Sequence, residues 1–183
     1  MFSKRASIAI SAAISAPFLL VACATPGTEN ATEKFAQATL LDASGKRIGE
    51  ATLIANGGAI QLAAEVAGLS PGDHGIHLHT TGKCDAPGFT TAGGHLNPSA
   101  HKHGMMNAAG PHMGDLPNIT VKPDGTGSIL TDLTGQSEDL RAAIFDADGS
   151  AIVVHAGPDD YKTDPAGNSG GRIACGVLAV ITP

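Results

Sequence analysis

The chain has 183 residues, of which 42% are hydrophobic and 3% aromatic, and it carries 17 acidic against 11 basic side chains. The formal charge of −6 argues against nucleic acid as a partner and against electrostatic adhesion to anionic lipid. Behind an N-terminal segment, about 150 residues remain, which is the size of one ordinary domain with enough residues to bury a core.

Residues 1–22 are predicted to be a signal peptide rather than part of the fold. Lys4 and Arg5 form a positive start, and the alanine-rich apolar run over residues 6–20 is too short to span a bilayer comfortably. The run ends in Leu-Val-Ala-Cys, which resembles a bacterial lipoprotein signal that is cleaved before Cys23 and acylated on that cysteine. An ordinary secretory signal with a chance cysteine is the alternative.

This segment predicts an exported protein. By the same resemblance, Ala24 favours the outer membrane, so we expect a bacterial periplasmic protein whose only membrane contact is a lipid on Cys23. Without Lys4 and Arg5, nine basic residues face seventeen acidic ones and the formal charge becomes −8. Residues 23–34 show no periodicity and are predicted to be a flexible tether to a domain that covers residues 35–183.

The number of cysteines agrees with export. Three is an odd number, but with Cys23 as the lipid site an even pair remains, Cys84 and Cys175. In an exported chain this pair is expected to form a disulfide, which by the chain-entropy model would stabilise the fold by roughly 4 kcal/mol. Two buried free thiols are the alternative.

The domain is predicted to be all-β. Short apolar runs, several with period-two alternation, lie between Gly, Pro, Asp and Asn turns and indicate strands at residues 35–41, 48–55, 59–66, 119–121, 127–133, 142–145, 151–154 and 173–181. We expect no helix beyond one turn at residues 137–141. This pattern is typical of an antiparallel sandwich or barrel. Residues 79–111 and 156–172 do not fit as strands, and such long loops are usually functional.

The histidines indicate a metal site. Seven of the eight lie between His74 and Asp115, among glycines and prolines, and the eighth is His155. His77 and His79 are two residues apart, so on a strand both imidazoles point to the same face. Three imidazoles and one carboxylate suit a closed zinc site, whereas imidazoles with an open position suit Cu(II). The candidate ligands are enough for two ions, and whether one histidine is shared stays open at this point.

Six motifs in this order resemble the copper–zinc superoxide dismutases: HGIHLH, GGHLNP, HKHG, GPHMGDLPN, VVHAGPDD and GGRIACG. The resemblance covers the chain from about residue 35 onward. It implies an eight-stranded antiparallel Greek-key β-barrel, an Ig-like sandwich architecture, with a long metal-binding loop and a long electrostatic loop outside the barrel.

The resemblance also implies a residue-by-residue assignment of one copper and one zinc ion per subunit. The copper ligands would be His77, His79, His95 and His155, and the zinc ligands would be His95, His103, His112 and Asp115. His95 would therefore bridge the two ions. Cys84 and Cys175 match the disulfide of the family, Arg172 matches the arginine beside the copper, and Asp159 matches a carboxylate that hydrogen-bonds one histidine of each metal.

The function implied is the dismutation of superoxide to dioxygen and hydrogen peroxide, an antioxidant oxidoreductase activity in which Arg172 and His95 act as catalytic residues. A periplasmic copper- or zinc-holding protein with incidental dismutase activity is the alternative, and a structural surface lipoprotein that kept only the fold is a further one. Whether the protein is a monomer or a homodimer is left open.

Several residues are expected to have lesser roles. His74 is expected to be structural and His101 to be a surface histidine, and the Met105-Met106 pair is expected to pack within its loop rather than bind Cu(I). Three lysines could steer an anionic substrate or be plain solvated charges: Lys83, Lys102 and Lys162.

Overall fold

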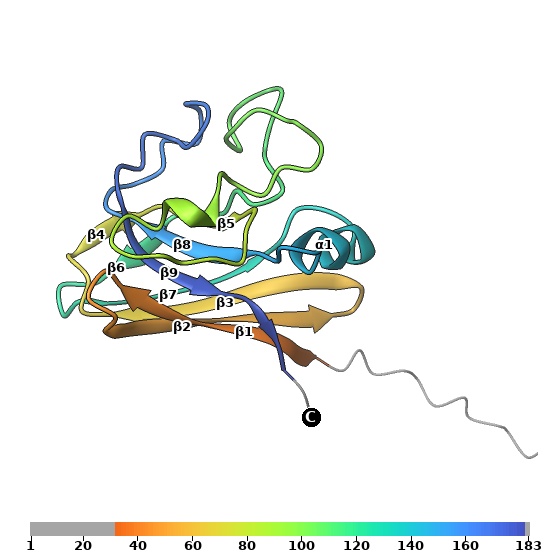
Figure 1. Ribbon diagram of the computed structural model, residues 1–183. Helices are drawn as coiled ribbons and strands as arrows, with labels where there is room; N and C mark the ends of the chain where they lie inside the picture. The colour runs from red at the N-terminus through yellow and green to blue at the C-terminus, as the bar shows by residue number, and fades with distance from the viewer. Residues whose placement is uncertain (1–31, 182–183) are drawn as a thin grey trace, which may run out of the picture.

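The computed structural model describes residues 32–181, most of which lie in or between ten β-strands (Figure 1). The strands are β1 (Glu33–Asp42), β2 (Arg47–Asn56), β3 (Ala59–Ala67), β4 (Gly72–His74), β5 (Ile76–His79), β6 (Ile119–Val121), β7 (Thr126–Asp132), β8 (Ala151–His155), β9 (Arg172–Val177) and β10 (Ala179–Val180). A 3-10 turn, η1 (Thr90–Ala92), and one helix, α1 (Ser137–Ile144), lie between them. No helix within residues 32–181 is long and apolar enough to cross a membrane.

The first three strands form a meander whose alternation follows the sequence pattern. In β3 the side chains of Ile60, Leu62, Ala64 and Val66 are buried, while the intervening residues face outward. The turn between β1 and β2 is closed by Asp42, whose carboxylate accepts a hydrogen bond from the Ser44 amide at 2.8 Å. These elements therefore confirm the predicted strands and the turn between the first two.

One segment closes the sheet into a barrel. The strand order is β4-β6-β7-β3-β2-β1-β9-β8-β5, so the two ends of the sheet, β4 and β5, are neighbours in the chain on either side of Gly75. At Gly75 the backbone exchanges hydrogen bonds with the end of β8 and the residues that follow it, accepting from His155 N and donating to Gly157 O, both at 2.8 Å. A Cβ at position 75 would lie 2.9 Å from the Ser169 side chain.

The expected eight-stranded antiparallel barrel is confirmed once two interruptions are recognised. β4 and β5 are halves of one strand broken at Gly75, and β9 and β10 are halves of one strand broken at Leu178. The expected strand over residues 173–181 is therefore divided at Leu178, whose N–H still donates to Ser150 O at 3.0 Å. β3 pairs with β7 and β1 with β9, which gives the sheet the crossovers expected of a Greek key.

The prediction of a strand at residues 142–145 is wrong, because α1 covers residues 137–144. The helix is also longer than the single turn expected at residues 137–141. Leu140 and Ile144 lie four residues apart and are fully buried against the barrel, so one helical face packs on the core. A short segment with only two buried apolar residues has too little periodicity to distinguish a helix from a strand in the sequence. At the N-terminal end, β1 begins at Glu33, two residues inside the expected tether.

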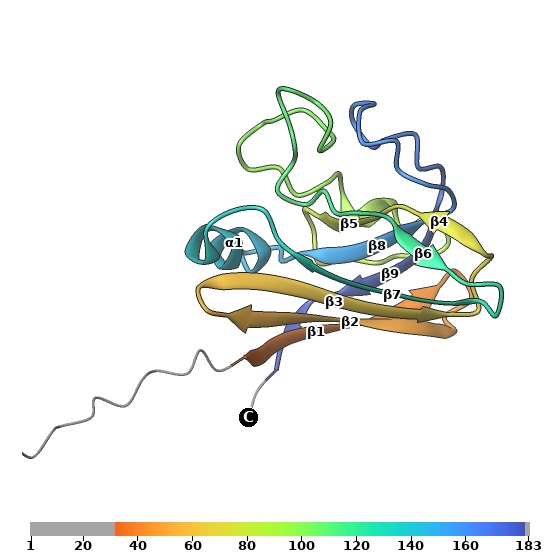
Figure 2. The same ribbon diagram turned by 180° about the vertical axis from the view of Figure 1, so that it is seen from behind.

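The two segments expected to be functional loops lie on the same side of the barrel. Figures 1 and 2 show the long connection between β5 and β6 and the connection between β8 and β9 rising together above the strands. The two connections begin at histidines, because β5 ends at His79 and β8 ends at His155.

Candidate metal centre

Strands β5 and β8 deliver three histidines to one place. In β5 the side chains of Ile76 and Leu78 point into the barrel core, so His77 and His79 point to its outer face. β8 pairs antiparallel with β5 and ends at His155. These outward-facing histidines are nevertheless buried, because the two long loops cover them.

The first cluster consists of His77, His79, His95 and His155, each of which offers a nitrogen within 4.8 Å of the others. These nitrogens are His77 Nδ1 and the Nε2 atoms of His79, His95 and His155, all buried and without a hydrogen-bond partner within residues 32–181. Buried polar atoms are rarely left unpaired. Four such imidazole nitrogens in one place fit a copper ion.

The outer nitrogens of three of these rings are held by oxygen atoms. His77 Nε2 contacts Asp159 Oδ2 at 2.7 Å, His79 Nδ1 contacts Gly93 O at 3.0 Å, and His155 Nδ1 contacts Gly170 O at 3.2 Å. An N–H donated outward leaves the inner nitrogen with its lone pair. The rings are thus oriented for coordination.

The second cluster consists of His95, His103, His112 and Asp115, whose ligand atoms also lie within 4.8 Å of one another. Asp115 Oδ1 is 2.9 Å from His95 Nδ1, 3.0 Å from His103 Nδ1 and 3.3 Å from His112 Nδ1. The other carboxylate oxygen accepts the backbone N–H groups of Gly104 and His112. Three imidazoles and a carboxylate, all buried, fit a closed zinc site.

His95 belongs to both clusters. Its Nε2 faces the first cluster and its Nδ1 lies beside Asp115 in the second. Composition left open whether a histidine is shared, and the family resemblance predicted His95. The position of this ring allows one imidazole to face two ions.

Asp159 links the clusters a second time. Its Oδ2 contacts His77 and its Oδ1 contacts His103 Nε2 at 3.0 Å, with the carboxylate fully buried. Asn118 holds the backbone of Asp159 at two points, donating from Nδ2 to Asp159 O at 2.9 Å and accepting from Asp159 N at 2.8 Å. The sequence reasoning missed Asn118, although it ends the motif GPHMGDLPN.

Burial keeps three rings of the first cluster, His77, His79 and His155, neutral. Desolvation lowers the pKa of His77 to about 3, that of His79 to about 2 and that of His155 to about 4. Neutral imidazole is the form that binds metals. For His103, burial opposes protonation, but the hydrogen bonds to Asp115 and Asp159 outweigh it and raise the pKa to about 9.

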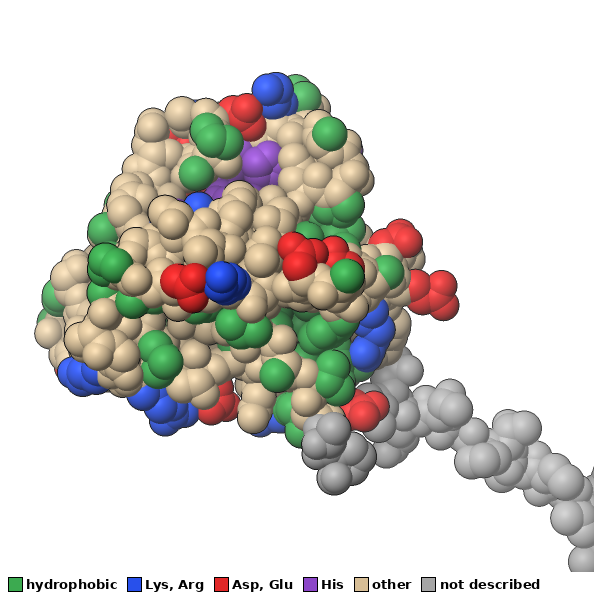
Figure 3. Space-filling model, viewed as in Figure 1, with side chains coloured by type: hydrophobic (Ala, Val, Ile, Leu, Met, Phe, Trp, Pro, Cys, Tyr) green, Lys and Arg blue, Asp and Glu red, His purple; other side chains and the backbone are tan. Residues whose placement is uncertain are grey.

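A cavity of about 350 Å³ opens over the first cluster. Figure 3 shows histidine side chains at the base of a hollow between the two loops. The residues lining the cavity include His79, His95, His155, Asp164 and Arg172. The cavity therefore reaches three rings of the first cluster, and it also touches His112 of the second.

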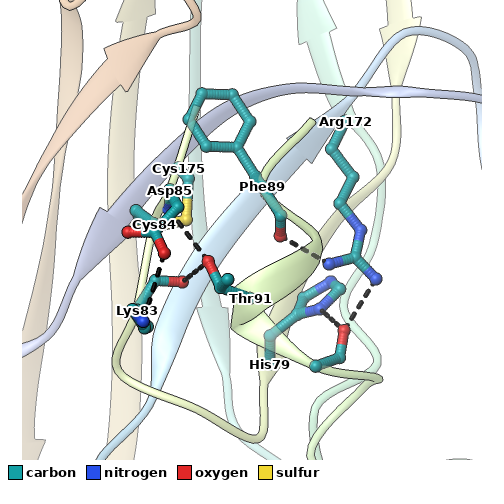
Figure 4. Close-up of a disulfide and its surroundings, with 9 residues drawn as sticks. His79, Lys83, Cys84, Asp85, Phe89, Thr91, Arg172 and Cys175 are labelled. Carbon is teal, nitrogen blue, oxygen red and sulfur yellow. Dashed lines mark hydrogen bonds and ion pairs between the residues drawn. A yellow bond between two sulfur atoms is a disulfide. The ribbon is translucent and has the colours of Figure 1, made fainter. Parts of the chain in front are cut away.

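Arg172 is fixed by two main-chain oxygens at the wall of this cavity. Nη1 donates to Phe89 O at 2.7 Å and Nη2 donates to Gly93 O at 2.6 Å (Figure 4). Gly93 O also holds His79, so one carbonyl orients both a ring of the first cluster and the guanidinium. A Cβ at Gly93 would collide with the Thr80 hydroxyl, and the backbone there has φ +75°.

A disulfide joins Cys84 to Cys175, with the Cα atoms 5.6 Å apart. It ties the loop after β5 to strand β9, at a position three residues after Arg172 in the chain (Figure 4). The disulfide lies in a small apolar cluster with Phe89, Ala92, Ala151 and Val153.

The remaining predicted residues lie around the centre. His74 is buried and contacts His155 O at 2.8 Å and Ser70 O at 2.9 Å, as expected of a structural residue. His101 is exposed at the cavity rim. Met105 and Met106 have exposed fractions of 45% and 63%, so the packing expected for them is not observed.

The fold and the two clusters define a β-barrel metalloprotein with a two-metal centre that shares one histidine. The family model "Copper/zinc superoxide dismutase (SODC)" matches residues 47–178. The chain belongs to the copper/zinc superoxide dismutase family, and that family implies copper and zinc as cofactors.

Relatives and solved structures agree with this family. The chain is 41% identical over 151 residues to "Superoxide dismutase [Cu-Zn] 1" of Aquifex aeolicus, covering 81% of this chain and 89% of that protein. The crystal structure of a SOD-like protein from Bacillus subtilis has a TM-score of 0.73 and 35% identity, covering 81% of this chain and 100% of that one. The Cu/Zn superoxide dismutase from Brucella abortus has a TM-score of 0.62 and 26% identity, covering 80% and 99%.

Proposed function

We propose that this protein catalyses the dismutation of two superoxide anions and two protons to dioxygen and hydrogen peroxide. The first cluster holds copper and the second holds zinc. The observation that carries this proposal is the set of unpaired buried imidazole nitrogens at the base of an open cavity, beside an oriented arginine.

The chain's own groups have distinct roles in this reaction. Copper, when bound, supplies one-electron redox chemistry. Arg172 binds the incoming anion by charge and hydrogen bonding, because its side chain reaches the cavity that leads to the first cluster. His95 Nε2, which would face the copper, would carry a proton to peroxide when it is not ligating the metal, while Nδ1 stays directed toward the second cluster.

The assignment of the two metals is tested by removing one ligand from each cluster. His155→Ala should lose copper and keep zinc, whereas His112→Ala should lose zinc with a smaller effect on copper, as measured by elemental analysis after dialysis. Superoxide consumption should require copper. Wild-type protein that holds both metals tightly but does not consume superoxide would instead indicate a metal-holding protein.

An exported location is consistent with the disulfide and with the bacterial relatives. We infer further that residues 1–22 are removed and that Cys23 carries lipid, anchoring the protein to the outer membrane; these residues lie outside the described part of the chain. Cys23→Ser should release the protein from membranes and leave its dismutase activity intact, because several acyl chains are what hold such an anchor. Wild-type protein found in the soluble fraction of a lipoprotein-processing bacterium would contradict the lipid anchor.

A further inference from the structure

The cavity contains a carboxylate where an anionic substrate has to enter. Asp164 lines the same cavity as Arg172 and as the histidines of the first cluster. Its Oδ1 lies 3.8 Å from His112 Nε2, so the charge is close to the metal centre. A negative charge at this place would repel superoxide and oppose Arg172.

Lys102 faces this carboxylate from the other loop. Its Nζ lies 3.0 Å from Asp164 Oδ2, and both side chains are exposed. Figure 3 shows a basic and an acidic side chain together on the rim of the hollow. An exposed pair of this kind contributes little to stability, so holding the loops together is a weak reason for it.

Asp164 is held in place independently of Lys102. The His103 backbone N–H donates to Asp164 Oδ1 at 2.8 Å. This hydrogen bond holds the carboxylate in the cavity wall whether or not Lys102 is present. Loss of Lys102 would therefore leave an uncompensated anion in the cavity wall.

We propose that Lys102 is a steering residue whose task is to neutralise Asp164, so that Arg172 sets the sign of the field that superoxide meets in the cavity. This inference rests on the proposed dismutase function. It assigns a role to one of the three candidate lysines. None of the three lysines lines the cavity, but Lys102 pairs with a carboxylate that does, whereas Lys83 pairs with Asp85 beside the disulfide.

The test compares Lys102→Met, Asp164→Asn and the double variant, all loaded equally with copper and zinc. At low salt kcat/KM should fall about threefold in Lys102→Met, rise up to about twofold in Asp164→Asn, and return close to wild type in the double variant, because rim charges act on the encounter rate. The differences should shrink at high salt, which screens the charges.

Matched controls remove one positive and one negative charge at positions that do not line the cavity. Lys34→Met on β1 and Glu138→Gln on α1 should leave kcat/KM close to wild type, which excludes an effect of net charge alone. If the ion pair served only to hold the two loops together, Lys102→Met and Asp164→Asn would both break it. Both variants would then shift kcat/KM in the same direction or not at all. Either result would overturn the proposal.

A second measurement does not depend on turnover. Azide binding to the copper-loaded protein, followed by visible absorption, should weaken in Lys102→Met and strengthen in Asp164→Asn. Equal azide affinity in both variants would also overturn the proposal. A wild-type protein that binds copper, zinc and azide but consumes no superoxide would refute the proposed function, whereas an active wild type with same-direction variants would refute only the role of Lys102.

Discussion

Within residues 32–181, Asp159 is the one side chain outside the two clusters that hydrogen-bonds to both of them. In the first cluster, main-chain carbonyls orient two other rings, His79 and His155. In the second cluster, His103 is the one ring with a hydrogen-bond partner outside the cluster within residues 32–181, and that partner is Asp159. Asp159→Asn should therefore weaken zinc binding by roughly 10–100-fold and copper binding by less. Competition with chelators measures both affinities.

Asp160 provides the matched control for this substitution. Its carboxylate caps a local turn through Thr163 and does not contact either cluster. Asp160→Asn should leave both metal affinities near wild type. Zinc affinity that is unchanged in Asp159→Asn, or lowered equally in both variants, would show that Asp159 does not orient His103.

The buried histidines make the stability of the metal-free protein depend on pH in two directions. Below their ordinary pKa of 6.5, His77, His79 and His155 are protonated in the unfolded chain but stay neutral in the folded one down to about pH 4 or lower. The unfolded state then binds more protons, so the free energy of unfolding falls with falling pH, by up to about 1.4 kcal/mol per pH unit for each histidine.

His103 acts in the opposite window. Its pKa is raised from 6.5 to about 9 in the folded protein, so its stabilising contribution is fully present below pH 6.5 and is lost as the pH rises through 9. Urea unfolding of the metal-free protein should therefore show maximal stability near pH 6.5. A profile that rises steadily from pH 5 to pH 9 would contradict this assignment.

At the scale of elements, the disulfide joins a long loop to the strand that carries Arg172. Replacing both Cys84 and Cys175 by serine should lower the free energy of unfolding by about 4 kcal/mol, because the link closes a loop across a sequence separation of 91 residues. Urea unfolding of the metal-free protein measures the loss. An unchanged free energy of unfolding in the double variant would show that the cross-link does not stabilise the fold by restricting the unfolded chain.

Some elements could be predicted from the sequence and others could not, for physical reasons. Alternating apolar residues predicted β1 to β3, because a half-buried strand has period two. The segment forming α1 offers only Leu140 and Ile144 as buried contacts, too few to distinguish a helix from a strand. The break at Gly75 depends on pairing with β6 and β8, which are far away in sequence.

In the metal centre, too, some residues could be predicted from the sequence and others could not. The residues of both clusters were identified from side-chain motifs, and the structure brings them all together. The oxygens of Gly93 and Phe89 that orient Arg172 belong to the main chain, so the residue types at these positions do not indicate their role. Asp164 was missed because its role depends on which loop faces it across the cavity.

At the scale of the whole molecule, the charge of the protein opposes its substrate. Residues 23–183 carry a formal charge of −8, which repels superoxide, so a fast reaction needs a local positive field that exceeds the global one. The low-dielectric walls of the cavity can focus the field of Arg172 toward the first cluster. Arg172→Glu reverses that local sign and should lower kcat/KM by about tenfold or more with copper still bound.

The salt dependence of the rate separates a steering role from a purely structural one. Added salt should slow the wild-type enzyme, because it screens an attraction, and should slow Arg172→Glu less or even accelerate it, because it then screens a repulsion. Since both Arg172 hydrogen bonds run to carbonyl oxygens, Arg172→Gln is the neutral comparison and should fall between the two. Equal rates and equal salt dependence in equally metallated wild type and Arg172→Glu would mean that Arg172 does not attract the substrate, and that the bound ions alone overcome the negative charge of the protein.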